Sequence, residues 1–461
     1  MIMEKTDKEN EATILEKEFV QTQTGEVQSS LKENITKLAR FGGFSFIEAT
    51  VEGTQNINPE KKARKKIFLG DISKQNEREA LINNLDLWIE LLSSNENTSE
   101  LITKCKAKNE KLSLLLKKNQ AATVDTVKEL ERSYREIAQF YVNTGSEKLT
   151  NIAIVNASPE QIADLDNPLF IEYIANELRQ NFDKLDLSGN YSLLVIPGYM
   201  GSKQVIDKWA EISHRNKVQL FTDFADLDQP DDVVEMFDSS YLAGGDVFRS
   251  HVSLSCNWPI GRNRYAELDE SDDLRISPSA SLAGKIYTTP MSQVTAGKKY
   301  GVINEVSGVA FPLKKSEISL LEKMGLIPMV NEYGSVMAFS AKTLFNGDNL
   351  GLQTYSVVRV FDYVTKVLFD FLNRRTFENW NSRLEKDIRR QIVNFLDSIT
   401  GPDALIEKFK VIRFERDPEN KDRIYLDINL TPYFPAKNYI LKLEGTKGDD
   451  DVKWDSECNQ E

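Results

Sequence analysis

The spacing of apolar residues divides the chain into a helical N-terminal part and a later part where strands and helices alternate. Residues 75–143 contain no proline and no glycine. Apolar side chains recur there at steps of three and four, as in Leu81, Leu85, Trp88, Ile89 and Leu92, and again in Val127, Leu130, Tyr134, Ile137 and Tyr141. This spacing predicts helices. The stretch 101–118 between them is thinly apolar and charged, which is typical of a protruding helix.

Strands and helices alternate from residue 148 onward. The apolar run in 191–198 is typical of a buried parallel strand, and 218–224 predicts the next strand. Ser158-Pro159 predicts the start of a helix between strands. The pattern favours α/β layering. Before the helical part, residues 1–40 predict a mobile arm, and alternation within 41–53 predicts a strand.

The C-terminal region has the clearest pattern. A helix is predicted by an apolar stripe of Val357, Val360, Phe361, Val364, Val367, Leu368 and Phe371. A second helix is expected over 378–399, followed by strands over 409–415 and 423–431 and by a last strand near 439–444. The acidic tail from Gly445 is expected to be disordered. The predicted domains are therefore 1–74, 75–145, 146–345 and 346–461.

Composition restricts the class of protein. With 461 residues, 40% of them hydrophobic and 28% charged, the chain should form two to four folding units. No apolar run approaches the roughly 18 residues that span a bilayer, and the first residues lack the apolar stretch of a signal peptide. Three distant cysteines favour a reducing compartment, so a cytoplasmic location is expected. A net charge of −13 argues against nucleic acid as a partner.

Candidate chemistry is sparse. The chain has two histidines, His214 and His251, both interpreted as ordinary structural residues. The loop 195–203 lacks the spacing of a phosphate-binding loop and predicts a plain strand-to-helix turn. Five aspartates within 222–232 are interpreted as helix caps and a solvated loop. We therefore expect no catalytic residue, no cofactor and no metal, with an α/β enzyme using carboxylates as the alternative class.

Two surfaces point to assembly. Ile424, Leu426, Ile428 and Leu430 share one strand face, and Tyr439, Leu441 and Leu443 share another. These strands either form a meander within the chain or add to sheets of neighbouring subunits. Arg383, Lys386 and Arg390 lie at i, i+3 and i+7, on one face of the second C-terminal helix. That face is either solvated or an attachment surface.

Several segments resemble a known family. They are "LLEKMGLIPMV" (320–330), "YSVVRVFDYVTKVL" (355–368), Trp380 and "IYLDINLTPYFPAKNYILKL" (424–443). Their order resembles the large sheath subunit of the type VI secretion system, with the likeness running over 149–444. The opening of the chain departs from the commoner pattern and looks like a divergent Bacteroidetes-type branch. The resemblance implies a contractile-sheath α/β core, with an N-terminal helical region and C-terminal strands that pair between subunits.

The resemblance also implies partners. These are a small sheath subunit in a heterodimer, copies of the chain in stacked hexameric rings, an inner tube protein, a baseplate and an AAA+ ATPase that recycles contracted sheath. The strands at 424–431 and 439–444 would link subunits, Arg383, Lys386 and Arg390 would face the tube, and 75–143 would contribute to the ATPase surface. Membrane insertion is not expected. A phage or phage-derived tail sheath is the alternative within the class.

Overall fold

The computed structural model describes residues 33–34, 36–37, 70–94, 97–145, 149, 152–437, 440–447 and 450–459. The strand predicted within 41–53 and most of the predicted arm lie outside these residues. The chain divides into two compact units, 1–120 and 121–461. The structure combines helices with β-sheets, which confirms the α/β class expected from the sequence.

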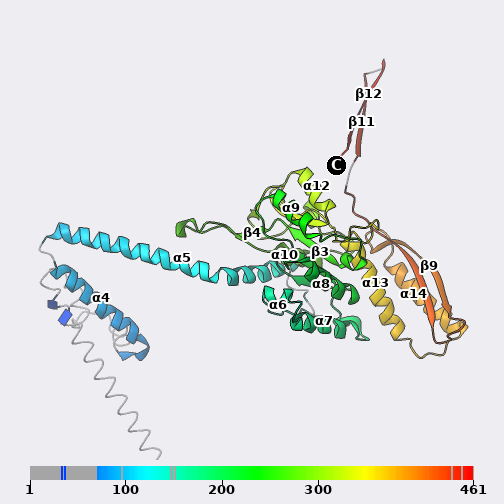
Figure 1. Ribbon diagram of the computed structural model, residues 1–461, viewed down its shortest axis with the longest axis horizontal. Coiled ribbons are helices and arrows are strands. Elements are labelled where there is room, and N and C mark those ends of the chain that lie inside the picture. Colours follow the sequence, from blue (N-terminus) through cyan, green and yellow to red (C-terminus); the bar gives the residue numbers. More distant parts are fainter. Residues whose placement is uncertain are drawn as a thin grey trace, which may run out of the picture. The chain divides into compact units, whose positions relative to one another are not determined.

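The first unit is helical in the residues described. Asp71 caps a short 3-10 helix, η1 (Ile72–Lys74), which leads into α4 (Gln75–Ser93). Helix α5 (Thr98–Thr144) follows and continues into the second unit (Figure 1). Because no glycine or proline interrupts it, α5 has 47 residues and is roughly 70 Å long at about 1.5 Å per residue. The helices predicted for 75–143 are confirmed, including the charged stretch 101–118.

A five-stranded sheet forms the centre of the second unit, in the order β1-β2-β3-β7-β8. The first four strands are parallel and β8 is antiparallel to β7. The strands predicted at 191–198 and 218–224 are β1 and β2, as expected. The five strands are β1 (Leu193–Ile196), β2 (Gln219–Asp223), β3 (Val252–Cys256), β7 (Leu326–Glu332) and β8 (Ser335–Ala338).

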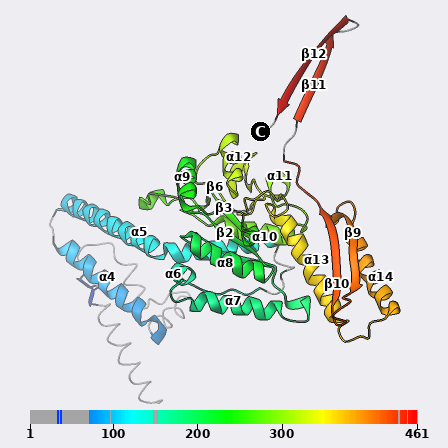
Figure 2. The ribbon, with the colours of Figure 1, turned by 45° about the vertical axis from the view of Figure 1, so that its right-hand side comes forward.

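Helices cover both faces of this sheet, because its residues alternate between two apolar clusters (Figures 1 and 2). Leu220, Leu254 and Leu326 pack on one side with α7 (Leu169–Phe182), α8 (Lys203–Arg215), α9 (Pro230–Ser240) and α12 (Lys315–Lys323). Phe221 and Ile327 pack on the other side with α10 (Pro278–Thr288) and the start of α13 (Tyr355–Asn373). The result is a helix–sheet–helix core.

Shorter elements complete this unit. A small antiparallel sheet has the order β5-β4-β6. Helix α6 begins at Pro159 and is capped by Ser158, as the sequence predicts. The short elements are α6 (Pro159–Ala163), η3 (Leu187–Gly189), η4 (Val247–His251), β4 (Pro259–Arg262), η5 (Ala266–Leu268), β5 (Leu274–Arg275), α11 (Gly297–Tyr300) and β6 (Gly308–Val309).

The C-terminal part has its own apolar cluster. Helices α13 and α14 (Ser382–Ser398) pack against the antiparallel pair β9 (Ile406–Arg416) and β10 (Ile424–Pro432). Helix α14 begins at Ser382 rather than near 378, because Asn381 accepts hydrogen bonds from the backbone N–H groups of Arg383 and Leu384.

A second antiparallel pair ends the described chain. It consists of β11 (Ile440–Lys447) and β12 (Asp450–Asn459). The prediction that the tail from Gly445 is disordered is wrong, since β12 pairs residue by residue with β11. Sequence reasoning missed this strand because its residues are mainly polar and acidic and carry no apolar alternation of the kind seen in β10.

Candidate assembly surfaces

The last turns of α5 belong to the second unit and attach to the rest of it through polar side chains. Arg262 lies 2.9 Å from Glu131 and 2.8 Å from Glu270, and its side chain is 8% exposed. Arg135 donates to the Gly261 carbonyl at 3.1 Å, and Gln139 donates to the Glu305 carbonyl at 2.8 Å. Each such bond contributes about 1 kcal/mol net. Hydrogen bonds and a buried ion pair therefore hold this face of α5 to the core.

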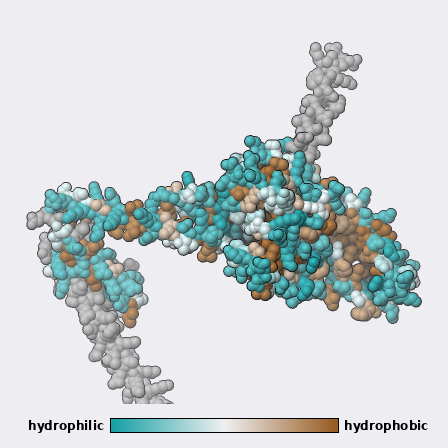
Figure 3. Space-filling model, viewed as in Figure 1, coloured by the Kyte–Doolittle hydropathy of each residue, from teal (hydrophilic) through white to brown (hydrophobic). Residues whose placement is uncertain are grey.

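The apolar stripe of α5 is left on the surface. Leu130 and Tyr134 are each 72% exposed, and Val127 and Ile137 are 40% and 45% exposed. With Tyr141, which is half-buried, their spacing of 3, 4, 3 and 4 is that of the a and d positions of a coiled coil. Figure 3 shows hydrophobic residues among hydrophilic ones along α5. A helix that turns its polar face to its own core and its apolar face outward has an unfilled packing surface.

Helix α14 has the opposite arrangement. Leu384, Ile388, Ile392 and Leu396 are buried at steps of four. Arg383, Lys386 and Arg390 are all exposed, as their predicted common face requires. Of these three, Arg390 pairs with Asp387 at 2.7 Å. Arg383, Lys386 and Arg390 therefore form an exposed basic stripe on α14.

The apolar strand face predicted from residues 424–430 packs against helices of the same chain. Leu426, Ile428 and Leu430 contact the apolar cluster of α13 and α14, whereas Ile424 is 45% exposed at the end of the strand. A register shift between Asp427 and Ile428 places a bulge in the ladder with β9. Strand β10 pairs with β9 along one edge, and no other described strand pairs with either. The apolar face of β10 therefore packs against α13 and α14 of the same chain, while one edge of the strand has no partner among the described strands.

The remaining predicted linking residues lie near the end of the chain. Leu441 and Leu443 are in β11, opposite Cys458 and Ser456 of β12. Tyr439 lies outside the described residues. Among the strands that the structure describes, β11 and β12 pair with each other and with no third strand. Both pairs thus have unpaired edges, the feature that strand addition between chains uses.

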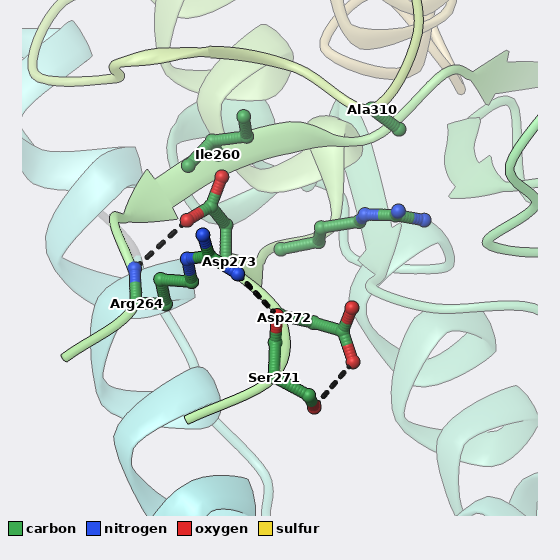
Figure 4. A pocket seen from close by; sticks show the side chains of 7 residues that line it. Ile260, Arg264, Ser271, Asp272, Asp273 and Ala310 are labelled. Atoms are coloured by element: carbon green, nitrogen blue, oxygen red, sulfur yellow. Dashed lines mark hydrogen bonds between the residues drawn. The ribbon is translucent and has the colours of Figure 1, made fainter. Parts of the chain in front are cut away.

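A cavity of about 280 Å³ lies beside the β4–β5 hairpin and is lined mainly by charged residues (Figure 4). Asp273 accepts from the backbone N–H of Arg264 at 2.8 Å, and the Arg264 side chain donates to the Ser271 carbonyl at 3.0 Å. The Ser271 hydroxyl donates to Asp272 at 2.6 Å. These groups satisfy one another within one loop. The cavity therefore has the character of a hairpin surface rather than of a reaction site.

The five aspartates of 222–232 do not act as the predicted helix caps. The N-cap residue of α9 is Gln229, and Asp231 and Asp232 lie exposed in its first turn, where a helix dipole favours acidic groups. Asp226 and Asp228 pair with Arg275 at 3.0 and 2.7 Å. The interpretation as caps is wrong because this loop turns toward β5 instead of toward the helix that follows it.

Asp223, at the end of β2, is fully buried. It accepts from the backbone N–H groups of Gly198 and Ser279 at 2.9 and 2.8 Å, and from the Ser279 hydroxyl. Burial raises the pKa of Asp223 to about 8 although these bonds favour its charged form. Gly198 and Gly201 have positive φ values of 94° and 85°, so the loop 195–203 is the strand-to-helix turn expected from the sequence. Asp223 thus anchors this turn.

The two histidines lie in one cluster, with His251 buried and His214 half-buried, which sequence reasoning missed. His214 Nδ1 lies 3.2 Å from His251 Nδ1, and His251 Nε2 lies 2.9 Å from Asp362 Oδ2. Burial is the main reason that the pKa of His214 is lowered to about 4. Asp362 belongs to α13, whose predicted core stripe is only partly right, because Phe361 is 41% exposed while Arg359 is 8% exposed.

A signal for this buried charged face existed in the sequence. Arg359, Asp362 and Lys366 lie at i, i+3 and i+7 of an otherwise apolar helix, and all three are buried. Cys256 is also buried, and burial raises the pKa of its thiol, so it is not an activated nucleophile. The described residues contain no group of three or more His, Cys, Asp or Glu side chains able to hold a metal ion. No helix within the described ranges has the length and apolar character needed to cross a membrane.

Three family models match consecutive parts of the chain. Residues 31–120 match the TssC/VipB-like N-terminal region, 122–346 match the type VI secretion system TssC/VipB central domain, and 354–460 match the TssC/VipB-like C-terminal domain. The N-terminal region, which sequence reasoning mapped poorly, is thus matched as well. The matches do not place the chain in a Bacteroidetes-type branch, which stays a prediction.

Solved structures with similar folds include the baseplate of the anti-feeding prophage, at 17% identity and a TM-score of 0.43, covering 66% of this chain and 83% of that chain. The contracted helical sheath of the same prophage gives 20% identity and a TM-score of 0.44, covering 62% and 76%. A sheath tail protein from Desulfitobacterium hafniense gives 13% identity and a TM-score of 0.41, covering 68% and 64%.

No curated protein sequence matches the chain. The family models, in contrast, follow one another in the same order as the helical N-terminal region, the α/β core and the C-terminal helices and strands described above. The chain therefore belongs to the TssC/VipB family and is a structural subunit of the type VI secretion contractile sheath.

Proposed function

We propose that this sheath subunit forms a heterodimer with a small sheath subunit that packs a helix on the exposed stripe of α5. The observation that carries the proposal is the reversed amphipathicity of α5, whose polar face contacts the core while Leu130 and Tyr134 are exposed. A stripe with heptad spacing accepts a second helix by knobs-into-holes packing. Burying four such side chains would contribute several kcal/mol, at about 25 cal/mol per Å² of apolar area.

Purification of the chain together with the small subunit tests this pairing. Leu130→Asp with Tyr134→Asp should abolish co-purification, because it places two charges in an apolar seam. Ser133→Asp is the matched control, since Ser133 is exposed on the same turn but outside the stripe. Circular dichroism should show an unchanged helix content in both variants. Co-purification that survives the double substitution would remove the stripe as the docking surface.

The heterodimers would stack as hexameric rings around an inner tube above a baseplate, and contraction would propel the tube. Contacts that do not close on themselves generate the open helical assembly that a long sheath needs. The energy would come from repacking of subunits, so the chain would act without catalysis, cofactor or metal. The protein would work in the cytoplasm, and the region of α4 and α5 would contribute to the surface that the AAA+ ATPase recognises.

Terminal strands would link neighbouring subunits through their open edges. Strands β10 and β11 each have one partner among the described strands, which leaves a second edge for another chain. The exposed edge, rather than the packed face of Leu426, Ile428 and Leu430, would form this contact. The side chains of Tyr439, Leu441 and Leu443 would fix its register by alternation.

Interruption of the last strand pair tests the linkage. Leu441→Pro removes a ladder hydrogen bond and should abolish ordered tubes in electron micrographs. The heterodimer should keep its thermal unfolding midpoint, because β11 pairs only with β12 among the described strands and not with β9 or β10, which complete the C-terminal apolar cluster. Lys421→Pro, at the second position of the turn from Asn420 to Arg423, is a control for proline itself, because turns of this kind accept proline there. Tubes that form normally with Leu441→Pro would contradict the linkage.

A further inference from the structure

A cavity of about 190 Å³ lies beside the buried charged face of α13, against residues of η3 and the segments before β1 and β2. Three cations, Lys217, Arg359 and Lys366, line it with one carboxylate, Asp362. Asn190 and Ser192 lie at its polar wall, and Ser192 is exposed. The cavity therefore has an excess of positive charge inside an acidic protein.

Arg359 feels the charge of Asp362 but forms no ion pair with it or with any other described residue. Its side chain is 8% exposed, and its Nε is buried without a hydrogen-bond acceptor. Within the described part of the chain, the guanidinium makes no ion pair and donates no hydrogen bond. A buried guanidinium without a counter-charge is costly, and proteins pair such groups with carboxylates or phosphates. The cavity thus offers a buried guanidinium with an unused donor to an added anion.

The one carboxylate of the cavity is already engaged. Asp362 lies 2.9 Å from His251 Nε2 and 3.9 Å from Lys217 Nζ. Lys366 donates to the Tyr191 carbonyl at 2.8 Å, which orients its ammonium but does not neutralise it. Burial lowers the pKa of Lys366 to about 8 and that of Arg359 to about 10. Asp362 opposes both shifts but does not offset the burial, so a bound anion would add to the compensation of these charges.

We propose that this cavity binds a compact oxyanion, a carboxylate or a phosphate, through the guanidinium of Arg359 and the ammonium of Lys366. A guanidinium presents two parallel N–H donors that match the oxygens of either group. Asn190 and Ser192 would add neutral donors at the entrance. The anion could be free in solution or could be an Asp or Glu side chain of a neighbouring sheath subunit.

Inorganic phosphate is the probe for the binding step. Calorimetric titration of the purified heterodimer should show saturable binding, and phosphate should raise the thermal unfolding midpoint of the wild-type protein more than that of Arg359→Met. Arg359→Met should weaken phosphate binding by at least about tenfold. Absence of saturable binding to the wild-type protein, or equal binding by Arg359→Met, would overturn the proposal.

Stability without phosphate separates binding from a structural role. Replacing an unpaired buried charge by an apolar side chain of similar length should leave the phosphate-free unfolding midpoint unchanged or raise it. Arg359→Met would lower that midpoint if the arginine instead held the fold together, and this result would count against the site. Arg215→Gln is the control, because Arg215 is exposed and pairs with Glu211 on α8, outside the cavity.

Assembly distinguishes the two sources of the oxyanion. This step depends on the sheath function, whereas phosphate binding by the heterodimer does not. If a neighbouring side chain is the natural occupant, phosphate should compete with it and slow tube formation in wild-type protein, with no effect on Arg359→Met. If the natural occupant is a free anion, phosphate should leave tube formation unchanged or promote it. Either result supports the site, provided that the titration shows binding.

Discussion

Helix α14 and the end of α5 both belong to the second unit and are both amphipathic, but they present opposite faces to the rest of that unit. Helix α14 buries Leu384, Ile388, Ile392 and Leu396 and exposes a basic stripe. The end of α5 contacts the core through Glu131, Arg135 and Gln139 and exposes its apolar stripe. The difference shows that α14 completes the fold of its own chain, whereas α5 carries a surface for another one.

The sharpest test of this contrast compares one leucine from each helix. Leu396→Ala should lower the free energy of unfolding by about 3 kcal/mol, because Leu396 is fully buried and its loss leaves a cavity. Leu130→Ala should change it by less than about 0.5 kcal/mol, since Leu130 is exposed. Urea unfolding followed by circular dichroism measures both. Equal losses would show that the apolar stripe of α5 is covered within its own chain.

The polar attachment of α5 should give the next largest effect. Glu131→Gln removes the charge that faces Arg262 and should weaken the attachment by about 2 kcal/mol. Hydrogen exchange of the backbone amides in 132–144 should then accelerate, with the amides of α14 unaffected. Glu129→Gln is the matched control, because its pair with Arg132 is largely exposed. Unchanged exchange in Glu131→Gln would mean that another contact holds the helix.

Between about pH 6.5 and 4, acid should act on the second unit through His214 of α8. The pKa of His214 is lowered to about 4 in the folded chain, so the unfolded chain binds a proton first as the pH falls below about 6.5. Stability linked to His214 is therefore present above pH 6.5 and is lost between about pH 6.5 and 4. After allowance for its partial exposure, the loss should be roughly 1–2 kcal/mol.

Unfolding midpoints measured across this pH range test the assignment. His214→Gln should flatten the dependence, because the substituted side chain does not titrate. An unchanged slope in His214→Gln would assign the acid response to other groups. The comparison variant is Lys208→Gln, which alters an exposed residue of α8 that is not among the charges acting on His214 and should leave the slope intact.

Reversal of the basic stripe on α14 should have the smallest effect on stability. Arg383→Glu, Lys386→Glu and Arg390→Glu together should change the free energy of unfolding by less than about 1 kcal/mol, because all three are exposed. If the stripe faces the inner tube, assembly of sheath on tube should nevertheless fall while the heterodimer persists. The control is reversal of charge at two exposed residues of β9, with Lys408→Glu and Lys410→Glu. Normal assembly on the tube would assign the stripe to solvent.

Local sequence was sufficient for most elements but not for their orientation. The period of 3.6 predicted α13 and the period of 2 predicted β10, because backbone geometry sets those periods directly, and a continuous apolar run predicted β1. They could not predict that Phe361 would be exposed and Arg359 buried, since that depends on which neighbour the helix meets. The same holds for the stripe of α5, which has the spacing of a core face and lies on the surface.

The sequence by itself determined the class of the protein, the helical and α/β regions, the basic stripe of Arg383, Lys386 and Arg390, and the family resemblance. Tertiary structure alone brought His214 to His251 and Asp362, left the Nε of Arg359 buried without an acceptor, and packed the apolar face of β10 against helices of the same chain. These outcomes depend on contacts between residues far apart in sequence, and burial fixes their energies. A local pattern records the period of an element, but the element's neighbours decide which face is buried.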